Sequence, residues 1–374
     1  MSAIGASSRH SATAEPELRW LEELSPWPKE FGLGRMRALL ADLGDPQRRY
    51  PAVHVVGTNG KTSTTLMTAA LLRSAGHHVG AYISPHVRGW SERVQVDGAD
   101  ADIQAVLARV RPLAAGATQF EVLTAGALAE FAEAGVDAAV VEAGLGGRLD
   151  ATNVLDARVV VLTNVALEHT HVLGETRDAI AAEKLAVVTP GAHVVLGEPE
   201  WEAAARTNGA SAVEVVAGSN LALARAAAEA LLGSAVDPSA AERLQVPGRL
   251  ERRSERPLEI WDGAHNLAGI GYLLPRVPAR EYTLLVSVLA DKDAGAMLRA
   301  LSALGSTLVA TASPSPRALS ADELAGLARP YFACVEAVPE PVAALARARA
   351  LAGPEGALLV TGSLYLLAAL MSVG

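Results

Sequence analysis

The sequence contains a single cysteine, Cys334, in 374 residues, so the chain cannot form a disulfide within itself. Such a chain fits a reducing compartment, and we expect it to act in the cytoplasm. The first residues, 1–16, lack the apolar run that a secretory signal peptide requires. We expect them to form a mobile tail.

Positive charge is also in deficit: 32 lysines and arginines stand against 41 aspartates and glutamates, for a net charge of −9. This balance argues against binding to nucleic acid or to an anionic membrane surface. One uncharged stretch, residues 357–374, is almost long enough to span a bilayer. Because Thr361, Gly362 and Ser363 interrupt it, we predict a strand, a turn and a buried helix there.

What the sequence does contain is an alternation of short apolar runs, such as 51–56 and 136–144, with helical patterns. This alternation is typical of a parallel sheet that is covered by helices on both faces. We therefore predict an α/β fold whose N-terminal domain, residues 17–249, is of the P-loop type with a mostly parallel sheet. A polar linker at 250–257 would lead to a smaller, Rossmann-like α/β domain at 258–374.

The feature that indicates chemistry most directly is a glycine-rich segment between a predicted strand and a predicted helix. It comprises Gly57, Thr58, Asn59, Gly60, Lys61 and Thr62. There the loop amides and the helix N-terminus face an anion, the glycines allow close approach, and the lysine adds positive charge. Val55 stands where the full Walker pattern has a glycine, so an ordinary strand–helix turn is the alternative. We predict that this segment, the phosphate loop, binds ATP.

Oxygen and nitrogen ligands follow other predicted strands. Ser84 follows the run 77–83, Glu142 ends the run 136–142, and His169 comes after the run 157–165. Ligands of an open parallel sheet bind beyond the carboxyl ends of its strands. These side chains would suit Mg²⁺, which takes few protein ligands and fills its shell with water and substrate oxygens. Taken singly, each could instead be an ordinary capping, ion-paired or polar residue.

Lys184 lies in the predicted helix 176–188 among mostly apolar residues. Its position alone favours a surface lysine, whose aliphatic stem covers apolar neighbours while the amine stays in water. A role in the site is the alternative interpretation.

In their order and spacing, these motifs resemble the bacterial folylpolyglutamate synthase/dihydrofolate synthase family within the Mur ligase superfamily. The resemblance runs nearly end to end and is carried by FGLGRMRALLADLGDP, HVVGTNGKTST, SPHVRGWSERVQVDG, VVEAGLGGRLDATNV, LTNVALEHTHVLGETRDAIAAEKLAVV, VPGRLE, WDGAHN, SVLADKD and VTGSLYLLAAL. The form RLDATN at 148–153 is similar to members that accept dihydropteroate, so both activities are expected.

The resemblance implies an ATP-dependent amide ligase with Mg²⁺ as cofactor and ATP as co-substrate. It would add L-glutamate to dihydropteroate or to a reduced folate through an acyl phosphate. The similar enzymes are usually monomers, so we expect a monomer without nucleic-acid or membrane partners. Two alternatives are another Mur-type ligase, acting on a UDP-linked cell-wall precursor, and a non-catalytic nucleotide-binding relative. Only residues 1–56 precede the phosphate loop, which argues against a separate UDP-binding domain.

The resemblance also implies roles for individual residues, and it reverses the preference for a surface Lys184. Catalytic roles fall on Lys61, His169 and Lys184, the last as a carbamylated lysine that orients magnesium. The implied magnesium ligands are Ser84, Glu142 and His169. Besides the phosphate loop, the implied ATP contacts are Asn220, Arg249, Asp262 and His265. The implied folate contacts are Gly32, Leu33, Phe120, Leu149, Asp150 and Ala151.

The chain departs from the family pattern in three places. Glu168 stands where the family commonly has aspartate, and Leu267-Ala268 stands where Pro-His is frequent. The segment between Trp201 and Asn220 is shorter than usual, because the family generally carries extra strands there. The short segment is the feature that favours the non-catalytic alternative.

Overall fold

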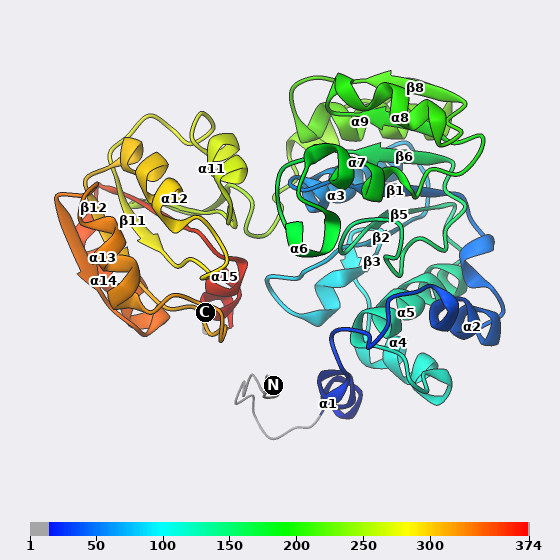
Figure 1. The fold of residues 1–374 in the computed structure, drawn as a ribbon, viewed down its shortest axis with the longest axis horizontal. Helices are drawn as coiled ribbons and strands as arrows, with labels where there is room; N and C mark the ends of the chain where they lie inside the picture. Colours follow the sequence, from blue (N-terminus) through cyan, green and yellow to red (C-terminus); the bar gives the residue numbers. More distant parts are fainter. Residues whose placement is uncertain (1–14, 373–374) are drawn as a thin grey trace. The chain divides into compact units, whose positions relative to one another are not determined.

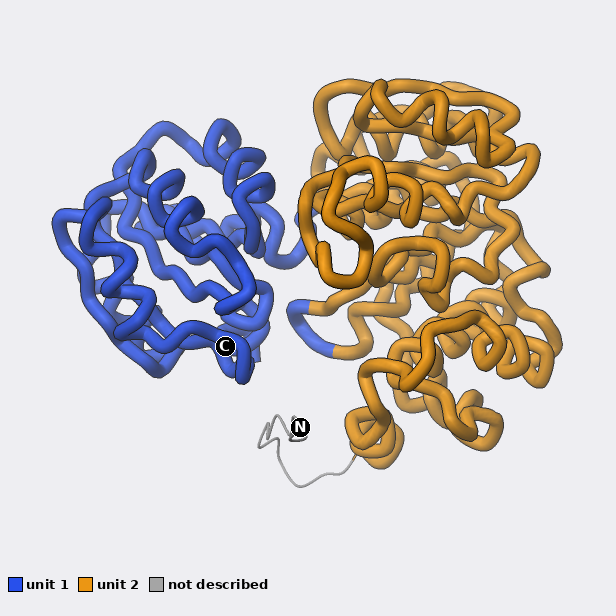
Figure 2. Tube along the Cα trace, viewed as in Figure 1, with its two compact units in different colours: residues 1–10, 87–89, 245–374 blue, residues 11–86, 90–244 orange. Residues whose placement is uncertain are grey.

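The computed structural model describes residues 15–372, and this part of the chain forms two compact units (Figures 1 and 2). The larger unit contains residues 15–86 and 90–244, and the smaller unit contains residues 87–89 and 245–372. Each has its own sheet covered by helices, which confirms the predicted α/β fold class. The tail predicted for residues 1–16 falls almost entirely outside the described residues.

The sheet of the larger unit has the strand order β4-β3-β2-β5-β1-β6-β7-β8. Its strands are β1 (Ala52–Val56), β2 (Val79–Tyr82), β3 (Val94–Val96), β4 (Ala99–Asp100), β5 (Ala138–Glu142), β6 (Val159–Leu162), β7 (His193–Leu196) and β8 (Ala212–Val215). The pairs β2–β5, β5–β1, β1–β6, β6–β7 and β7–β8 are parallel. The pairs β2–β3 and β3–β4 are antiparallel and form one edge of the sheet. The carboxyl ends of β2, β5, β1 and β6 therefore meet at one edge of the sheet.

Helices cover both faces of this sheet because its central strands are apolar on both sides. Leu71 of α3 and Leu223 of α9 pack on the face that carries Val53 and Val55 of β1. The helices of this unit are α1 (Pro16–Glu23), α2 (Gly34–Asp42), α3 (Lys61–Ser74), α4 (Ile103–Val110), α5 (Gln119–Ala134), α6 (Thr170–Leu173), α7 (Arg177–Leu185), α8 (Glu202–Thr207), α9 (Asn220–Leu232) and α10 (Ser239–Glu242). Buried side chains of α2, α4, α5 and α7 pack on the opposite face of the sheet. The larger unit is thus a three-layer α/β structure (Figure 1).

The sheet of the smaller unit has the order β13-β12-β11-β14-β10-β9. Its strands are β9 (Glu251–Glu255), β10 (Leu258–Trp261), β11 (Tyr282–Val286), β12 (Thr307–Ala310), β13 (Cys334–Ala337) and β14 (Ala357–Thr361). Its helices are α11 (Leu267–Leu273), α12 (Ala294–Leu301), α13 (Ala321–Ala328), α14 (Pro341–Ala352) and α15 (Leu364–Met371). The pairs β10–β14, β14–β11, β11–β12 and β12–β13 are parallel. Among these strands, only the β9–β10 pair is antiparallel.

The polar stretch 250–257, predicted as a linker, contains an edge strand instead: β9 pairs with β10. The strand sequence Glu-Arg-Arg-Ser-Glu gives no apolar alternation, because an edge strand that faces water on both sides needs none, and charge protects its open edge. β8 was likewise not predicted, and it is largely exposed at the other sheet's edge. The short segment between Trp201 and Asn220 therefore still carries a strand.

The uncharged C-terminal stretch folds as predicted, with β14, a turn and then α15. Gly362 makes the turn at φ +95°, and Ser363 caps the helix by accepting a hydrogen bond from the Tyr365 amide at 3.2 Å. Within residues 15–372, no helix is long and apolar enough to cross a membrane.

Candidate active site

The phosphate loop joins β1 to α3, and its two glycines are required by both conformation and space. Gly57 has φ +148° and Gly60 has φ +83°. A Cβ at position 57 would lie 1.8 Å from Thr163 Oγ1, and one at position 60 would lie 2.5 Å from Asn220 Oδ1. Neither position can hold a larger residue without displacing the packed neighbour. Asn220, the first residue of α9, thus lies directly against the loop.

The start of α3 has the properties of an anion site. The helix begins at Lys61, and its first turn contains no acidic residue. Its first amides have no acceptor within the helix, and the helix dipole adds partial positive charge at this end. Lys61 folds back over the loop, with Nζ donating to Thr58 O at 3.2 Å. Backbone amides and a primary amine therefore surround the space beside the loop.

The segment that follows β6 holds the middle of the phosphate loop. Asn164 O accepts from the Thr58 amide at 2.9 Å, and Asn164 Oδ1 accepts from the Asn59 amide at 3.1 Å. In return, Asn164 Nδ2 and Thr163 Oγ1 both donate to Asn59 O, at 2.9 and 2.7 Å. The sequence predictions did not include Thr163 or Asn164. A polar pair at the carboxyl end of the run 157–165 was the signal that could have indicated them.

Side-chain oxygens that could bind a cation lie next to the loop, at the carboxyl ends of β5 and β2. Glu142 is only 1% exposed; its Oε1 accepts from Thr62 Oγ1, and its Oε2 accepts from the Ser84 amide, both at 3.1 Å. Among the described residues, Ser84 Oγ is a buried oxygen with no hydrogen-bond partner. Hydroxyl and carboxylate oxygens are the ligands that small, hard cations prefer. The structure thus brings together Ser84 and Glu142, as predicted from the sequence.

In residues 15–372, no group of three His, Cys, Asp or Glu side chains could hold a metal ion on its own. A cation bound here would therefore draw on hydroxyl, water or phosphate oxygens as well, as Mg²⁺ commonly does. His169, the third predicted ligand, immediately precedes α6 and has φ +52°, a conformation uncommon for residues other than glycine. It follows β6, the strand next to β1.

Lys184 is buried in α7, with 4% of its surface exposed, so the interpretation of a surface lysine is wrong. Its Nζ donates to Gly57 O at 2.8 Å. Desolvation, with the nearby charge of Lys61, lowers the pKa of Lys184 from 10.5 to about 7. A large fraction of this amine is therefore uncharged and nucleophilic near neutral pH.

Asp150 is buried beside the same edge, between the exposed Leu149 and the buried Ala151. Its Oδ2 accepts from the Leu145 amide at 2.7 Å, and its Oδ1 accepts from the Thr152 amide at 3.0 Å and from Thr152 Oγ1 at 2.5 Å. Desolvation raises the pKa of Asp150, and these hydrogen bonds oppose the rise. The carboxylate is rigidly held, as a specific binding group requires.

His54, which the sequence predictions did not include, supports this arrangement from β1. Its Nε2 lies 2.8 Å from Thr152 Oγ1, so it is linked through Thr152 to Asp150. Burial lowers the pKa of His54 from 6.5 to about 4, and the imidazole is therefore neutral at physiological pH. A polar residue inside an apolar strand was the available signal.

The remaining predicted folate contacts lie near the first turn of α5. A Cβ on Gly144 would lie 2.6 Å from Phe120 Cζ, so Phe120 packs closely on the loop that follows β5. Gly32–Leu33 immediately precede α2. Arg35 of α2 donates to Glu121 at 3.3 Å, which ties this segment to α5 next to Phe120.

The other predicted ATP contacts, from the smaller unit, form a cluster of their own. Asp262 accepts from the Leu250 amide at 2.8 Å and from the Ala264 amide at 2.9 Å. Arg249 Nη1 donates to its neighbouring carbonyl, that of Gly248, at 3.0 Å. Burial raises the pKa of Asp262, and the charge of Arg249 opposes that shift. The ring of His265, with Nδ1 2.9 Å from the Gly263 carbonyl oxygen, completes the cluster.

Comparison with known proteins gives this architecture a family. Residues 55–212 match the Mur ligase middle domain, and residues 248–364 match the Mur ligase glutamate ligase domain. The chain is 33% identical to the dihydrofolate synthase/folylpolyglutamate synthase of Mycobacterium tuberculosis over 80% of this chain and 78% of the relative. The two matched domains define the chain as a Mur ligase.

Solved structures agree with this classification. The structure of E. coli FolC in complex with DHPP and ADP has a TM-score of 0.86 and 29% identity, and covers 99% of each chain. The bifunctional folylpolyglutamate synthase/dihydrofolate synthase from Yersinia pestis, complexed with AMPPNP and Mn ion, has a TM-score of 0.86 and 28% identity over 100% of this chain and 99% of that chain. The chain therefore belongs to the dihydrofolate synthase/folylpolyglutamate synthase family, whose members are ATP-dependent ligases, as its motifs predicted.

The burial of Lys184 makes stability depend on pH in a defined window. Between about pH 7 and the ordinary lysine pKa of 10.5, the unfolded chain holds a proton on this amine that the folded chain has released. Wild-type stability therefore rises with pH across that window, whereas the Lys184→Met variant lacks this contribution. We expect the advantage of Lys184→Met in free energy of unfolding to be greatest below pH 7 and to shrink by at most about 1.4 kcal/mol per pH unit above it.

Urea titrations of both proteins between pH 6 and 10, in buffer without dissolved CO₂, measure this difference. A difference that stays constant over the whole range would contradict the assigned burial of an ionisable amine.

Proposed function

We propose that the chain is an ATP- and Mg²⁺-dependent ligase that joins L-glutamate to dihydropteroate and to tetrahydrofolate. The observation that carries this proposal is the arrangement of the phosphate loop, Glu142, Ser84 and Lys184 at one edge of the larger sheet, in a chain of this family. Of the two structurally similar proteins above, one is complexed with DHPP and ADP and the other with AMPPNP and Mn ion. These ligands support a nucleotide, a divalent cation and a pterin-type acceptor here.

The chemistry follows from the poor reactivity of a carboxylate. The acceptor carboxylate oxygen attacks the γ-phosphorus of ATP, the bond to ADP breaks, and an acyl phosphate forms. The loop amides and Lys61 stabilise the charge on the transferring phosphoryl oxygens. The amine of glutamate then attacks the acyl carbon, phosphate leaves with its electron pair, and loss of the ammonium proton gives the amide.

Ser84, Glu142 and His169 are the proposed ligands of the cation, and the unpartnered Ser84 Oγ beside the Glu142 carboxylate fits this role. The bound cation would supply positive charge to the phosphate oxygens. Asn220, against Gly60, is a proposed nucleotide contact, and Arg249, Asp262 and His265 remain proposed contacts on the family resemblance. Asp150, Leu149, Ala151, Phe120 and Gly32–Leu33 are the proposed acceptor contacts.

Carbamylation of Lys184 is part of the proposal. An uncharged amine attacks CO₂, forms an N–C bond and releases a proton, and the pKa of about 7 leaves much of this amine uncharged at neutral pH. The product is an anion in place of a cation, which suits a neighbouring magnesium ion. We also propose that the protein is a monomer and acts in the cytoplasm, on the family resemblance and on its single cysteine.

Phosphate release by the purified protein tests the proposed function. With MgATP and glutamate, we expect release to require dihydropteroate or tetrahydrofolate, run side by side as acceptors, because each supplies the carboxylate to be activated. Lys61→Ala should abolish it by removing the charge over the loop. If only a UDP-linked cell-wall precursor supports phosphate release, the protein is another Mur-type ligase. If none of these acceptors supports phosphate release, the protein is not a ligase for any of them.

Chemical rescue tests the carbamate. Lys184→Ala should lose activity and regain part of it when a short-chain carboxylic acid is added, because the acid supplies the missing carboxylate in the space left by the side chain. Lys61→Ala is the matched control, since it removes an amine from the same site that is not proposed to be modified. If neither variant responds to the acid, or both respond equally, Lys184 does not act as a carbamate.

A further inference from the structure

Two residues outside the proposed ATP contacts, Arg177 and Glu198, bind the segment that hydrogen-bonds the phosphate loop. This segment, residues 163–169, lies between β6 and α6, and we call it the β6 loop. β6 ends at Leu162, and the Thr163 amide still donates to the carbonyl of Val56, the last residue of β1, at 3.0 Å. Through Asn164, the β6 loop hydrogen-bonds the Thr58 and Asn59 amides of the phosphate loop.

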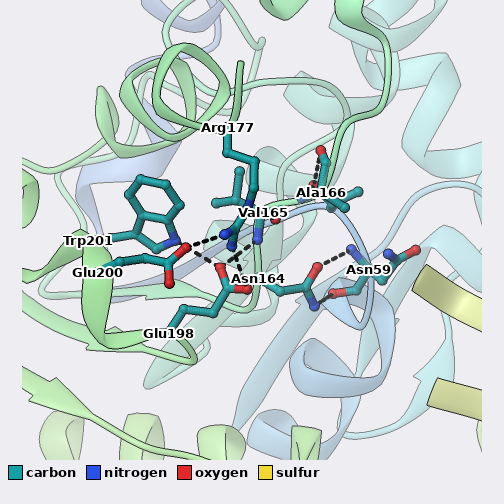
Figure 3. Close-up of polar contacts among 9 residues, drawn as sticks. Asn59, Asn164, Val165, Ala166, Arg177, Glu198, Glu200 and Trp201 are labelled. Carbon is teal, nitrogen blue, oxygen red and sulfur yellow. Dashed lines mark hydrogen bonds and ion pairs between the residues drawn. The ribbon is translucent and has the colours of Figure 1, made fainter. Parts of the chain in front are cut away.

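The two backbone polar groups of Val165 are both bound by side chains from other elements. The Val165 amide donates to Glu198 Oε2 at 2.9 Å, and the Val165 carbonyl accepts from Arg177 Nε at 2.9 Å. Figure 3 shows these two side chains reaching Val165, next to the pair formed by Asn164 and Asn59. The two contacts replace strand pairing and fix the backbone one residue away from Asn164.

Arg177 and Glu198 are themselves joined by an ion pair and share further partners. Arg177 Nη2 donates to Glu198 Oε1 at 2.9 Å, and Trp201 Nε1 donates to Glu198 Oε2 at 2.8 Å. The Arg177 guanidinium also lies 5.2 Å from the centre of the Trp201 ring and pairs with Glu200. Since a guanidinium has donors in a fixed fork, Arg177 can bind the carbonyl and the carboxylate at the same time.

Helix α7, which begins with Arg177, contacts the phosphate loop through a residue of its last turn. Arg177 begins α7, and Lys184, two helical turns later, donates to Gly57 O. α7 therefore touches the loop directly through Lys184 and indirectly through Arg177, Val165 and Asn164.

We propose that Arg177 and Glu198 are positioning residues for ATP binding, which act through Val165 and Asn164 to hold the phosphate loop in its nucleotide-binding shape. This inference rests on the proposed ATP site, and neither residue is assigned a contact with substrate. Without the pair, Val165 loses both side-chain contacts of its backbone, although the Ala166 amide still donates to Thr58 Oγ1 at 3.1 Å. The neighbouring Asn164 is then less firmly placed as the acceptor of the Thr58 and Asn59 amides.

The variants Arg177→Lys and Glu198→Gln test this role. Lysine keeps the charge but not the fork. The glutamine amide keeps one accepting oxygen but places an N–H donor at the other position, opposite either Arg177 or the Val165 amide. Glu200→Gln is the matched control, because Glu200 pairs with the same arginine but makes no assigned contact with Val165. We expect both test variants to bind MgATP about tenfold more weakly, as is typical when outer partners of a binding site are removed, and the control to bind within about twofold of wild type.

A double-mutant cycle separates positioning from general stability. If Arg177 acts through Asn164, the variant Arg177→Lys/Asn164→Ala should bind MgATP no more weakly than the weaker single variant, whereas independent effects would multiply. Amide exchange gives a second readout. Thr58 and Asn59 amides should exchange faster in Arg177→Lys and not in Glu200→Gln, while β5 amides stay protected in both.

Calorimetric titration of the full chain with MgATP decides among the outcomes. Weaker binding that is non-additive with Asn164→Ala supports the inference. Wild-type affinity in Arg177→Lys and Glu198→Gln, or additive effects with uniform loss of amide protection, overturns it while the proposed function stands. Absence of MgATP binding by the wild type would contradict both.

Discussion

The site depends on one close approach: the phosphate loop lies so near the segment after β6 that Gly57 has no room for a Cβ beside Thr163. This contact aligns the loop carbonyls and amides with Asn164 on one side and with Lys184 on the other. A loop held in this way presents its remaining amides and the α3 N-terminus outward, where an anion binds. The proposed cation ligands lie at the same edge because parallel strands end together there.

Lys184 shows how strongly the fold can alter a side chain. In water, a lysine amine is protonated and unreactive, but the same packing that brings α7 against Gly57 removes Lys184 from solvent and places Lys61 near it. Both effects lower the pKa of Lys184 and leave a nucleophilic amine beside the phosphate loop. A lysine in an exposed part of the same helix would have neither property, so the chemistry proposed here is a product of burial.

Much of this could be predicted from the sequence, because its signals are local. The apolar runs gave the central strands, the glycine-rich segment gave the loop, and position at strand ends indicated Ser84 and Glu142. Edge strand β9 was missed because an exposed strand needs no apolar pattern. Edge strand β8 was missed although its sequence, Ala-Val-Glu-Val, is a short apolar run. The contacts of Asn164 with Asn59, of His54 with Thr152 and of Arg177 with Val165 join residues distant in sequence. No local pattern encodes such pairs, and the burial of Lys184 is of the same kind.

Calorimetric titration of MgATP into Gly57→Ala tests the central claim most directly, with Gly271→Ala as control. Among the described residues, nothing lies within 4 Å of a Cβ at position 271 in α11, whereas one at position 57 meets Thr163. The account predicts that wild type and Gly271→Ala bind MgATP equally, and that Gly57→Ala shows no measurable binding although it still unfolds cooperatively. Binding by Gly57→Ala with wild-type affinity would contradict the claim that this close approach shapes the ATP site.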